Sequence, residues 1–379
     1  MILIINWKMK NTLKVILWIV AVLAALILIM VVVLWIASPG KLPLLEDAEG
    51  KVIPGSISER REIILGDLKQ GFFIRSENPD NPVILYLHGG PGSPELPMIM
   101  AEEEQERLEK YFTVCYWDQR GTGMSYRSDL GADDLTIQHY VDDARDLTKY
   151  LMERFEKDKI YLMGSSWGSY LGIKVIEQYP ELYYTYMGIG QVTHQHLSEQ
   201  LAYEYMLDHA NEVNDHKALK ELGQYDPLSE GFPQLDYLMG TRTTLMNKYG
   251  IGIMREDFSM FSLVMDVMMF RGYKMRDKVG YVRGSLLALE NVFYFMIDDN
   301  LFESSTHFNV PVYVLHGLYD YQVSYALATE YVNMIEAPAK GLYTFEKSAH
   351  SPNMEEPARF IRVVRDIVGL HNGSNYPLD

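Results

Sequence analysis

The chain has 379 residues, 48% of them hydrophobic, so it is long enough for one large domain or two moderate ones. Its 34 Lys and Arg are outnumbered by 51 Asp and Glu, and the resulting net charge of −17 argues against a nucleic-acid partner. The single cysteine, Cys115, excludes an internal disulfide and a cysteine-rich metal site, and its apolar neighbours indicate a buried residue. We expect no metal and no cofactor.

The first predicted element is a transmembrane helix over residues 15–37. This stretch contains no charged residue and would span about 34 Å at ~1.5 Å per residue, enough to cross a hydrocarbon core of roughly 30 Å. Trp18 and Trp35 lie near its two ends, where indole rings favour the membrane interface. The pattern predicts a single-pass membrane anchor.

The charges around this stretch predict its orientation. Lys8, Lys10 and Lys14 precede it, whereas the lysines that follow it are mixed with acidic residues. The positive-inside rule then places residues 1–14 in the cytoplasm as a short tail, and everything after Ser38 outside.

A cleaved signal peptide is the alternative interpretation of the same stretch. Its apolar core is usually only about 7 to 15 residues long and ends in a small-x-small cleavage site. Trp35 and Ile36 do not fit such a site, which favours the uncleaved anchor.

Residues 38–60 are rich in Pro, Gly and charge and are predicted to tether the anchor to a folded domain. Short apolar runs that end in turn residues then alternate with helical stretches over 61–190 and 307–371, which predicts a mostly parallel α/β sheet. Residues 191–306 are helix-rich and break this alternation. We interpret them as a helical cap inserted at the carboxyl ends of the strands, where such folds bind ligands.

The stretch 164–168, GSSWG, fits the pattern G-x-S-x-G between a predicted strand and a predicted helix. In this arrangement the central serine occupies a strained position in a sharp turn, and the flanking glycines remove Cβ atoms that would clash. The pattern predicts Ser166 as a nucleophile at the N-terminus of a helix. An ordinary Gly/Ser loop is the alternative for the motif taken alone.

A serine nucleophile needs a base and a group that orients the base. Asp320 and His350 each follow a later predicted strand, in the hydrolase order Ser, acid, His, and on the same edge of the sheet as Ser166. The backbone N–H of Trp167 is expected to contribute to an oxyanion hole, with a second donor from the glycine-rich loop 88–92.

These residues resemble the proline iminopeptidase family of α/β-hydrolases. The resemblance implies an enzyme that removes an N-terminal residue, often proline, from peptides. It implies Ser166 as nucleophile, His350 as base and Asp320 as its orienting partner, with the Gly90 and Trp167 N–H groups as the oxyanion hole. The motifs that carry it are HGGPG at 88–92, DQRGTG at 118–123, GSSWGS at 164–169, HGLYD at 316–320 and SAHSP at 348–352.

In this family, glutamates of the cap bind the free amine of the substrate, and Glu199 and Glu204 are the candidates here. A buried ammonium group must be paired, so such carboxylates have a physical role, although either glutamate would also suit a solvated helix surface. Without them the same triad would suit an esterase or amidase acting on lipophilic esters. A non-catalytic binding protein of the same fold is the third reading, against which the complete triad argues.

Overall fold

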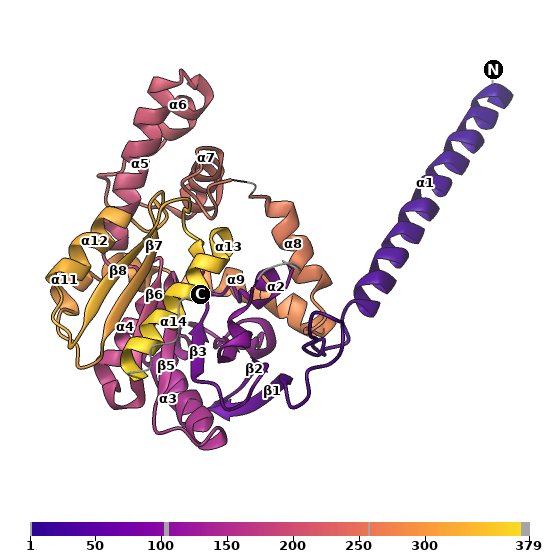
Figure 1. Cartoon of the computed structure of the whole chain (residues 1–379). Coiled ribbons are helices and arrows are strands. Elements are labelled where there is room, and N and C mark those ends of the chain that lie inside the picture. The colour runs from indigo at the N-terminus through magenta and orange to yellow at the C-terminus, as the bar shows by residue number, and fades with distance from the viewer. Residues whose placement is uncertain (1, 102–105, 257, 373–379) are drawn as a thin grey trace.

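The computed structural model describes residues 2–101, 106–256 and 258–372, and its centre is one eight-stranded sheet (Figure 1). The strand order is β1-β2-β4-β3-β5-β6-β7-β8. Strands β1 and β2 form a hairpin and β2 runs antiparallel to β4, whereas the other neighbours are parallel. The mostly parallel sheet predicted from the sequence is therefore confirmed. The strands are β1 Ile57–Leu65, β2 Leu68–Ser76, β3 Val83–Leu87, β4 Thr113–Asp118, β5 Ile160–Ser165, β6 Tyr183–Ile189, β7 Val312–Gly317 and β8 Lys340–Phe345.

Helices cover both faces of this sheet. Helices α3 (Ile137–Arg154), α4 (Trp167–Gln178) and α12 (Tyr325–Met334) pack against one face, and α14 (Pro357–Asn372) packs against the other. The side chain of Thr136 accepts a hydrogen bond from the backbone N–H of His139 and caps α3. Cys115 is fully buried on β4, in agreement with its apolar neighbours.

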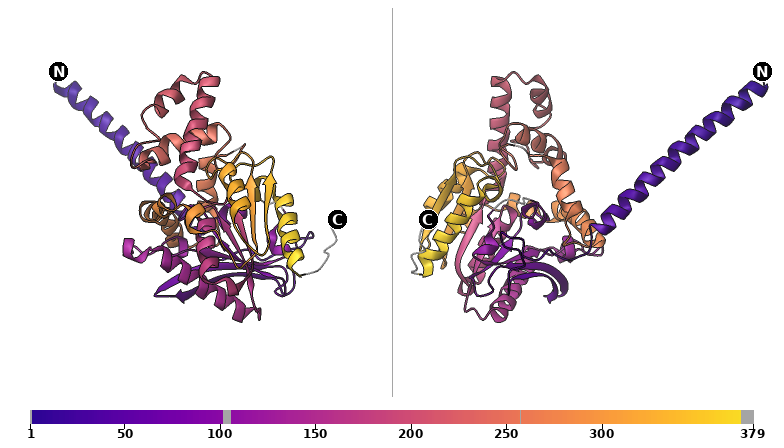
Figure 2. Two further views of the ribbon diagram at one scale, coloured as in Figure 1. Left: turned by 90° about the vertical axis from the view of Figure 1, so that its left-hand side faces the viewer. Right: turned by 45° about the vertical axis from the view of Figure 1, so that its right-hand side comes forward.

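The chain leaves the sheet after β6 and returns at β7, its hydrogen-bonded neighbour. The described residues of the intervening segment are largely helical and lie beyond one end of the strands (Figures 1 and 2). Its helices are α5 Gln195–Glu212, α6 His216–Leu222, the π-helical turn η5 Tyr237–Arg242, α7 Thr243–Lys248, α8 Met260–Met269, α9 Met275–Asn291, α10 Tyr294–Asp298 and α11 Leu301–Ser304.

Helix α1 (Ile2–Ile36) projects away from the rest of the chain (Figure 2). Its stretch Lys14–Ile36 is long and apolar enough to cross a membrane and is not buried against the domain, features that a signal sequence shares. The segment that follows α1 contacts the folded domain. Leu42 and Leu45 are buried, and Lys41 N–H donates to Arg271 O at 3.0 Å. The segment expected as a tether thus begins to pack onto the domain within a few residues of the helix end.

Candidate active site

The chain turns sharply at Ser166, between β5 and α4. Ser166 has φ 52° and ψ −119°, a backbone conformation that residues with a side chain rarely adopt. Its N–H donates to Ile189 O at 2.8 Å, and its carbonyl oxygen accepts from Ser169 N–H at 2.7 Å. These bonds hold the strained serine at the apex of a strand–turn–helix, the geometry that G-x-S-x-G predicts.

The two glycines of the motif are required by close backbone contacts. A Cβ on Gly164 would lie 2.2 Å from the carbonyl oxygen of Gly168, and a Cβ on Gly168 would lie 2.0 Å from that of Leu87. No other residue type fits at either position without a backbone shift. The turn is therefore pressed against the end of β3.

Asp320 and His350 meet at the carboxyl ends of β7 and β8. Asp320 Oδ2 lies 2.7 Å from Nδ1 of His350, and Asp320 is fully buried. Burial alone would lower the pKa of His350, but the neighbouring Asp320 carboxylate raises it above its ordinary value. Burial would likewise raise the pKa of Asp320, but His350 and a second histidine hold it below its usual range.

That second histidine is His316, at the end of β7. Its Nδ1 accepts from Gln191 N–H at 3.3 Å, which leaves the ring proton on Nε2. Nε2 lies 2.9 Å from Val323 O and 3.1 Å from Asp320 Oδ2. The Asp320 carboxylate also accepts from Val323 N–H at 2.9 Å, so its orientation toward His350 is fixed from several sides.

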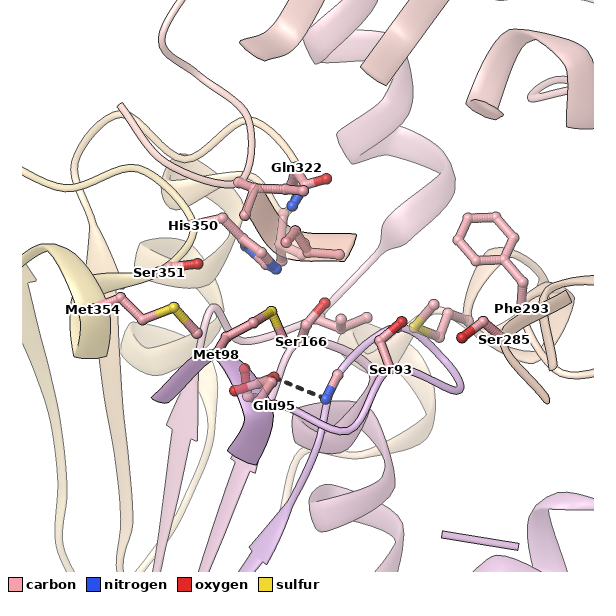
Figure 3. Close-up of a pocket in the computed structure, with 18 of the residues that line it drawn as sticks. Ser93, Glu95, Met98, Ser166, Ser285, Phe293, Gln322, His350, Ser351 and Met354 are labelled. Atoms are coloured by element: carbon pink, nitrogen blue, oxygen red, sulfur yellow. Dashed lines mark hydrogen bonds between the residues drawn. The ribbon is translucent and has the colours of Figure 1, made fainter. Parts of the chain in front are cut away.

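Ser166 and His350 line one pocket of about 390 Å³, into which both side chains point (Figure 3). Asp320 is not among the lining residues and lies behind His350. Much of the wall is apolar, formed by Met98, Val192, Ile253, Met260, Leu263, Phe293, Met296, Val323 and Met354. Within the described residues no group of three or more His, Cys, Asp or Glu side chains is placed to hold a metal ion.

The predicted oxyanion-hole residues flank Ser166. Gly90 lines the pocket and has φ 113°, a conformation available to glycine. Trp167 is the first residue of α4, where a backbone N–H has no acceptor inside its own helix. The preceding His88 is fully buried, which lowers its pKa to about 4, and its Nε2 accepts from Gln119 N–H at 3.2 Å.

The two cap glutamates named from the sequence lie away from the pocket wall. Glu199 is fully buried on α5, and both of its oxygens contact the Arg242 guanidinium, at 2.6 and 2.7 Å. Arg242, not Glu199, lines the pocket. Glu204 is exposed on α5 and is not among the lining residues.

Among the described residues, the carboxylate that lines the pocket is Glu95, which follows the glycine-rich loop (Figure 3). Its Oε1 accepts from Gly89 N–H at 3.0 Å, and its other oxygen accepts a short hydrogen bond from the Tyr86 hydroxyl. Burial raises the pKa of Glu95 above its ordinary value, against the opposing effect of these hydrogen bonds. A Cβ on Gly89 would lie 3.0 Å from Glu95 Oε1 and 3.1 Å from Ser166 Cβ, so Glu95 and Ser166 are close neighbours.

Sequence reasoning did not identify His316, Glu95 or Arg242 as site residues. A local signal existed for two of them: His316 stands in HGLYD, and Glu95 comes three residues after HGGPG. Arg242 lies in the cap, where no motif distinguishes it from the other basic residues of that segment.

Comparison with known proteins supports the fold and the class of enzyme. The family profile described as alpha/beta hydrolase fold matches residues 82–217. A Bacillus subtilis (strain 168) protein named probable aminopeptidase YbaC is 33% identical over 310 residues, covering 80% of this chain and 94% of its own. The proline iminopeptidase of Neisseria gonorrhoeae is 29% identical over 117 residues, covering 31% and 35% of the two chains.

Solved structures give the same fold. The crystal structure of the proline iminopeptidase of Mycobacterium smegmatis aligns over 83% of this chain and 98% of its own, with a TM-score of 0.55. The sequence identity is 17%, so this likeness speaks for the fold alone.

Proposed function

Because this chain belongs to the proline iminopeptidase-like family of α/β-hydrolases, we propose that it removes an N-terminal residue from peptides by a serine acyl-enzyme mechanism. The observation that carries the proposal is the shared pocket of Ser166 and His350, with Asp320 hydrogen-bonded to the far side of the imidazole. This arrangement of nucleophile, base and orienting carboxylate suits acyl transfer.

In the proposed reaction the Ser166 hydroxyl attacks the scissile carbonyl carbon while His350 Nε2 takes the hydroxyl proton. Asp320 keeps the other ring nitrogen protonated and stabilises the imidazolium that forms. The Gly90 and Trp167 N–H groups are the proposed donors to the oxyanion. His350 then protonates the leaving amine, and water releases the acyl group by the reverse sequence of proton transfers.

We assign the recognition of the free amine to Glu95. The amine of an N-terminal residue sits one carbon from the scissile carbonyl, so its partner must lie beside the nucleophile. Glu95 satisfies this condition, since its Oε1 and the Cβ of Ser166 both lie within 3.1 Å of the position that a Cβ on Gly89 would take. Glu199, the family-based candidate, is paired with the Arg242 guanidinium and does not line the pocket, and Glu204 faces outward.

An esterase or amidase acting on lipophilic esters is the second candidate function. The apolar wall of the pocket favours it, because acyl or alkyl groups would be buried there without unpaired polar atoms. The two candidates share the triad and differ in whether the substrate must carry a free amine.

We further propose that α1 is an uncleaved single-pass anchor, with the N-terminus cytoplasmic and the catalytic domain outside. The exposed apolar stretch Lys14–Ile36 and the preceding lysines support this topology. Retention of an N-terminal tag in the membrane fraction after alkaline carbonate washing would support the uncleaved anchor. A shortened, soluble product would identify a cleaved signal peptide.

Two assays test the catalytic proposal. A fluorophosphonate probe should label the wild type and Ser165→Ala but not Ser166→Ala, and an unlabelled wild type would refute both enzymatic candidates. A prolyl-arylamide should be cleaved and its N-acetylated form should not. Equal turnover of the two would exclude an aminopeptidase and leave the esterase or amidase.

A further inference from the structure

Helix α8 is apolar on two sides. On the side that faces the pocket, Met260 and Leu263 line it and Val267 is buried, with Met260 at the rim and 49% exposed. Toward the solvent lies a second apolar stripe, which we call the α8 outer face. Its members recur at helical spacing: Phe261 is 75% exposed, Val264 45%, Met265 38% and Met269 43%. An apolar helix face that is exposed at a protein surface indicates a site of contact with another protein or a membrane.

The α8 outer face adjoins the end of the proposed membrane anchor. The Nζ of Lys278, on α9, donates to Ala37 O at 3.0 Å and also to Met268 O, near the end of α8. Lys278 thus joins the foot of α1 to the end of α8, and burial lowers its pKa to about 8. Figure 1 shows α8 between the rest of the cap and the foot of α1.

Exposed cations gather at this junction, although the chain as a whole carries −17 and Asp266 lies on α8 itself. Lys41, Arg271 and Lys274 are exposed where α1 and α8 end, and Lys41 N–H is hydrogen-bonded to Arg271 O. Exposed cations beside an apolar helix face are the combination that binds a bilayer with anionic headgroups.

We propose that the α8 outer face lies in the interface of the same bilayer that α1 crosses, and that anionic lipid headgroups contact the adjoining cations. Because the inner side of α8 lines the pocket, the entrance is then held at the lipid surface. The substrates are amphiphilic peptides or esters that partition into that layer. The inference rests on the proposed anchoring function of α1.

The test uses the full-length protein, one copy per nanodisc of phosphatidylcholine and phosphatidylglycerol, with a nitroxide-labelled lipid as quencher. An environment-sensitive fluorophore is attached through Phe261→Cys, since Cys115 is buried and the wild type controls for its labelling. Ile64→Cys, on β1 and 65% exposed, is the matched control away from α8. Ile19→Cys reports insertion of α1.

We expect strong quenching at positions 19 and 261 and none at 64. Quenching at 19 without quenching at 261 would overturn the inference and leave the anchor intact. Absence of quenching at both positions would refute the anchor and, with it, the inference. The catalytic proposal would not be affected, because cleavage of a soluble arylamide tests it independently. Protection of position 261 in detergent, together with a dimer, would show that a second copy covers this face.

A kinetic arm checks the consequence for substrates. Phe261→Asp with Val264→Asp should raise the KM for a lipid-linked arylamide roughly tenfold or more, since a buried Phe contributes at least one such factor. The KM for a soluble arylamide should stay unchanged. Equal changes for both substrates would overturn the proposed entrance at the lipid surface.

Discussion

The indole Nε1 of Trp167 donates a 2.8 Å hydrogen bond to Oε1 of Gln119. The amide nitrogen of the same Gln119 side chain donates to His88 O at 3.0 Å. One buried glutamine therefore links the glycine-rich loop to the first residue of α4. These are the two segments from which the oxyanion-hole donors are proposed to come, so Gln119 sets the distance between them.

We predict that Gln119→Ala lowers kcat about 10- to 100-fold with little change in KM, because a displaced donor loses transition-state contact rather than substrate contact. Steady-state kinetics on a prolyl-arylamide measures the split. Gln70→Ala is the matched control, since Gln70 accepts from another buried indole, that of Trp117, at 3.1 Å. Equal kcat losses in the two variants would assign Gln119 a purely structural role.

The acid limb of the pH profile should depend on Asp320. His350 must be neutral to accept a proton, and its pKa is raised, so kcat/KM should increase with pH through a midpoint above 6.5. Asp320→Asn removes the charge that raises this pKa. The midpoint should therefore move to lower pH, and kcat should fall by about 10⁴-fold. An unmoved midpoint would mean that another group controls the limb.

Glu95→Gln should impair the cleavage of substrates that carry a free amine and leave the cleavage of substrates without one unchanged. We expect KM for a free-amine arylamide to rise about tenfold or more, as loss of a charged hydrogen-bond partner implies, and turnover of an acyl ester to be unchanged. Burial raises the pKa of Glu95, so acidification should protonate it and raise KM for the free-amine substrate in the wild type. If KM rises equally for both substrates, Glu95 supports the loop rather than the amine.

Arg242→Met should destabilise the chain by about 3–5 kcal/mol, because it leaves the Glu199 carboxylate buried without its cation. The double variant Glu199→Leu with Arg242→Met should recover much of this loss. Denaturant titration of the detergent-solubilised full chain measures both. Lys217→Met, which removes an exposed pair with Glu221, should change stability by less than about 0.5 kcal/mol.

The sequence allowed prediction of those parts of the site that local rules determine. The turn at Ser166 needs two glycines at fixed spacing, and Asp320 and His350 follow strands whose ends meet at one edge of the sheet. The contacts of Gln119 and Arg242 could not be predicted, because they join side chains from separate segments. Packing of the cap against the sheet decides them, and no short pattern encodes that packing.

The path of the chain between β6 and β7 has a consequence for how such enzymes diversify. These strands are hydrogen-bonded neighbours, yet more than a hundred residues of cap separate them in sequence. Insertions or exchanges within that excursion leave the register of the two strands, and hence the relative positions of Ser166, Asp320 and His350, untouched. The catalytic residues and the substrate specificity can therefore evolve independently. Replacing the cap by that of a relative should change which substrates are cleaved without changing the arrangement of the three catalytic residues.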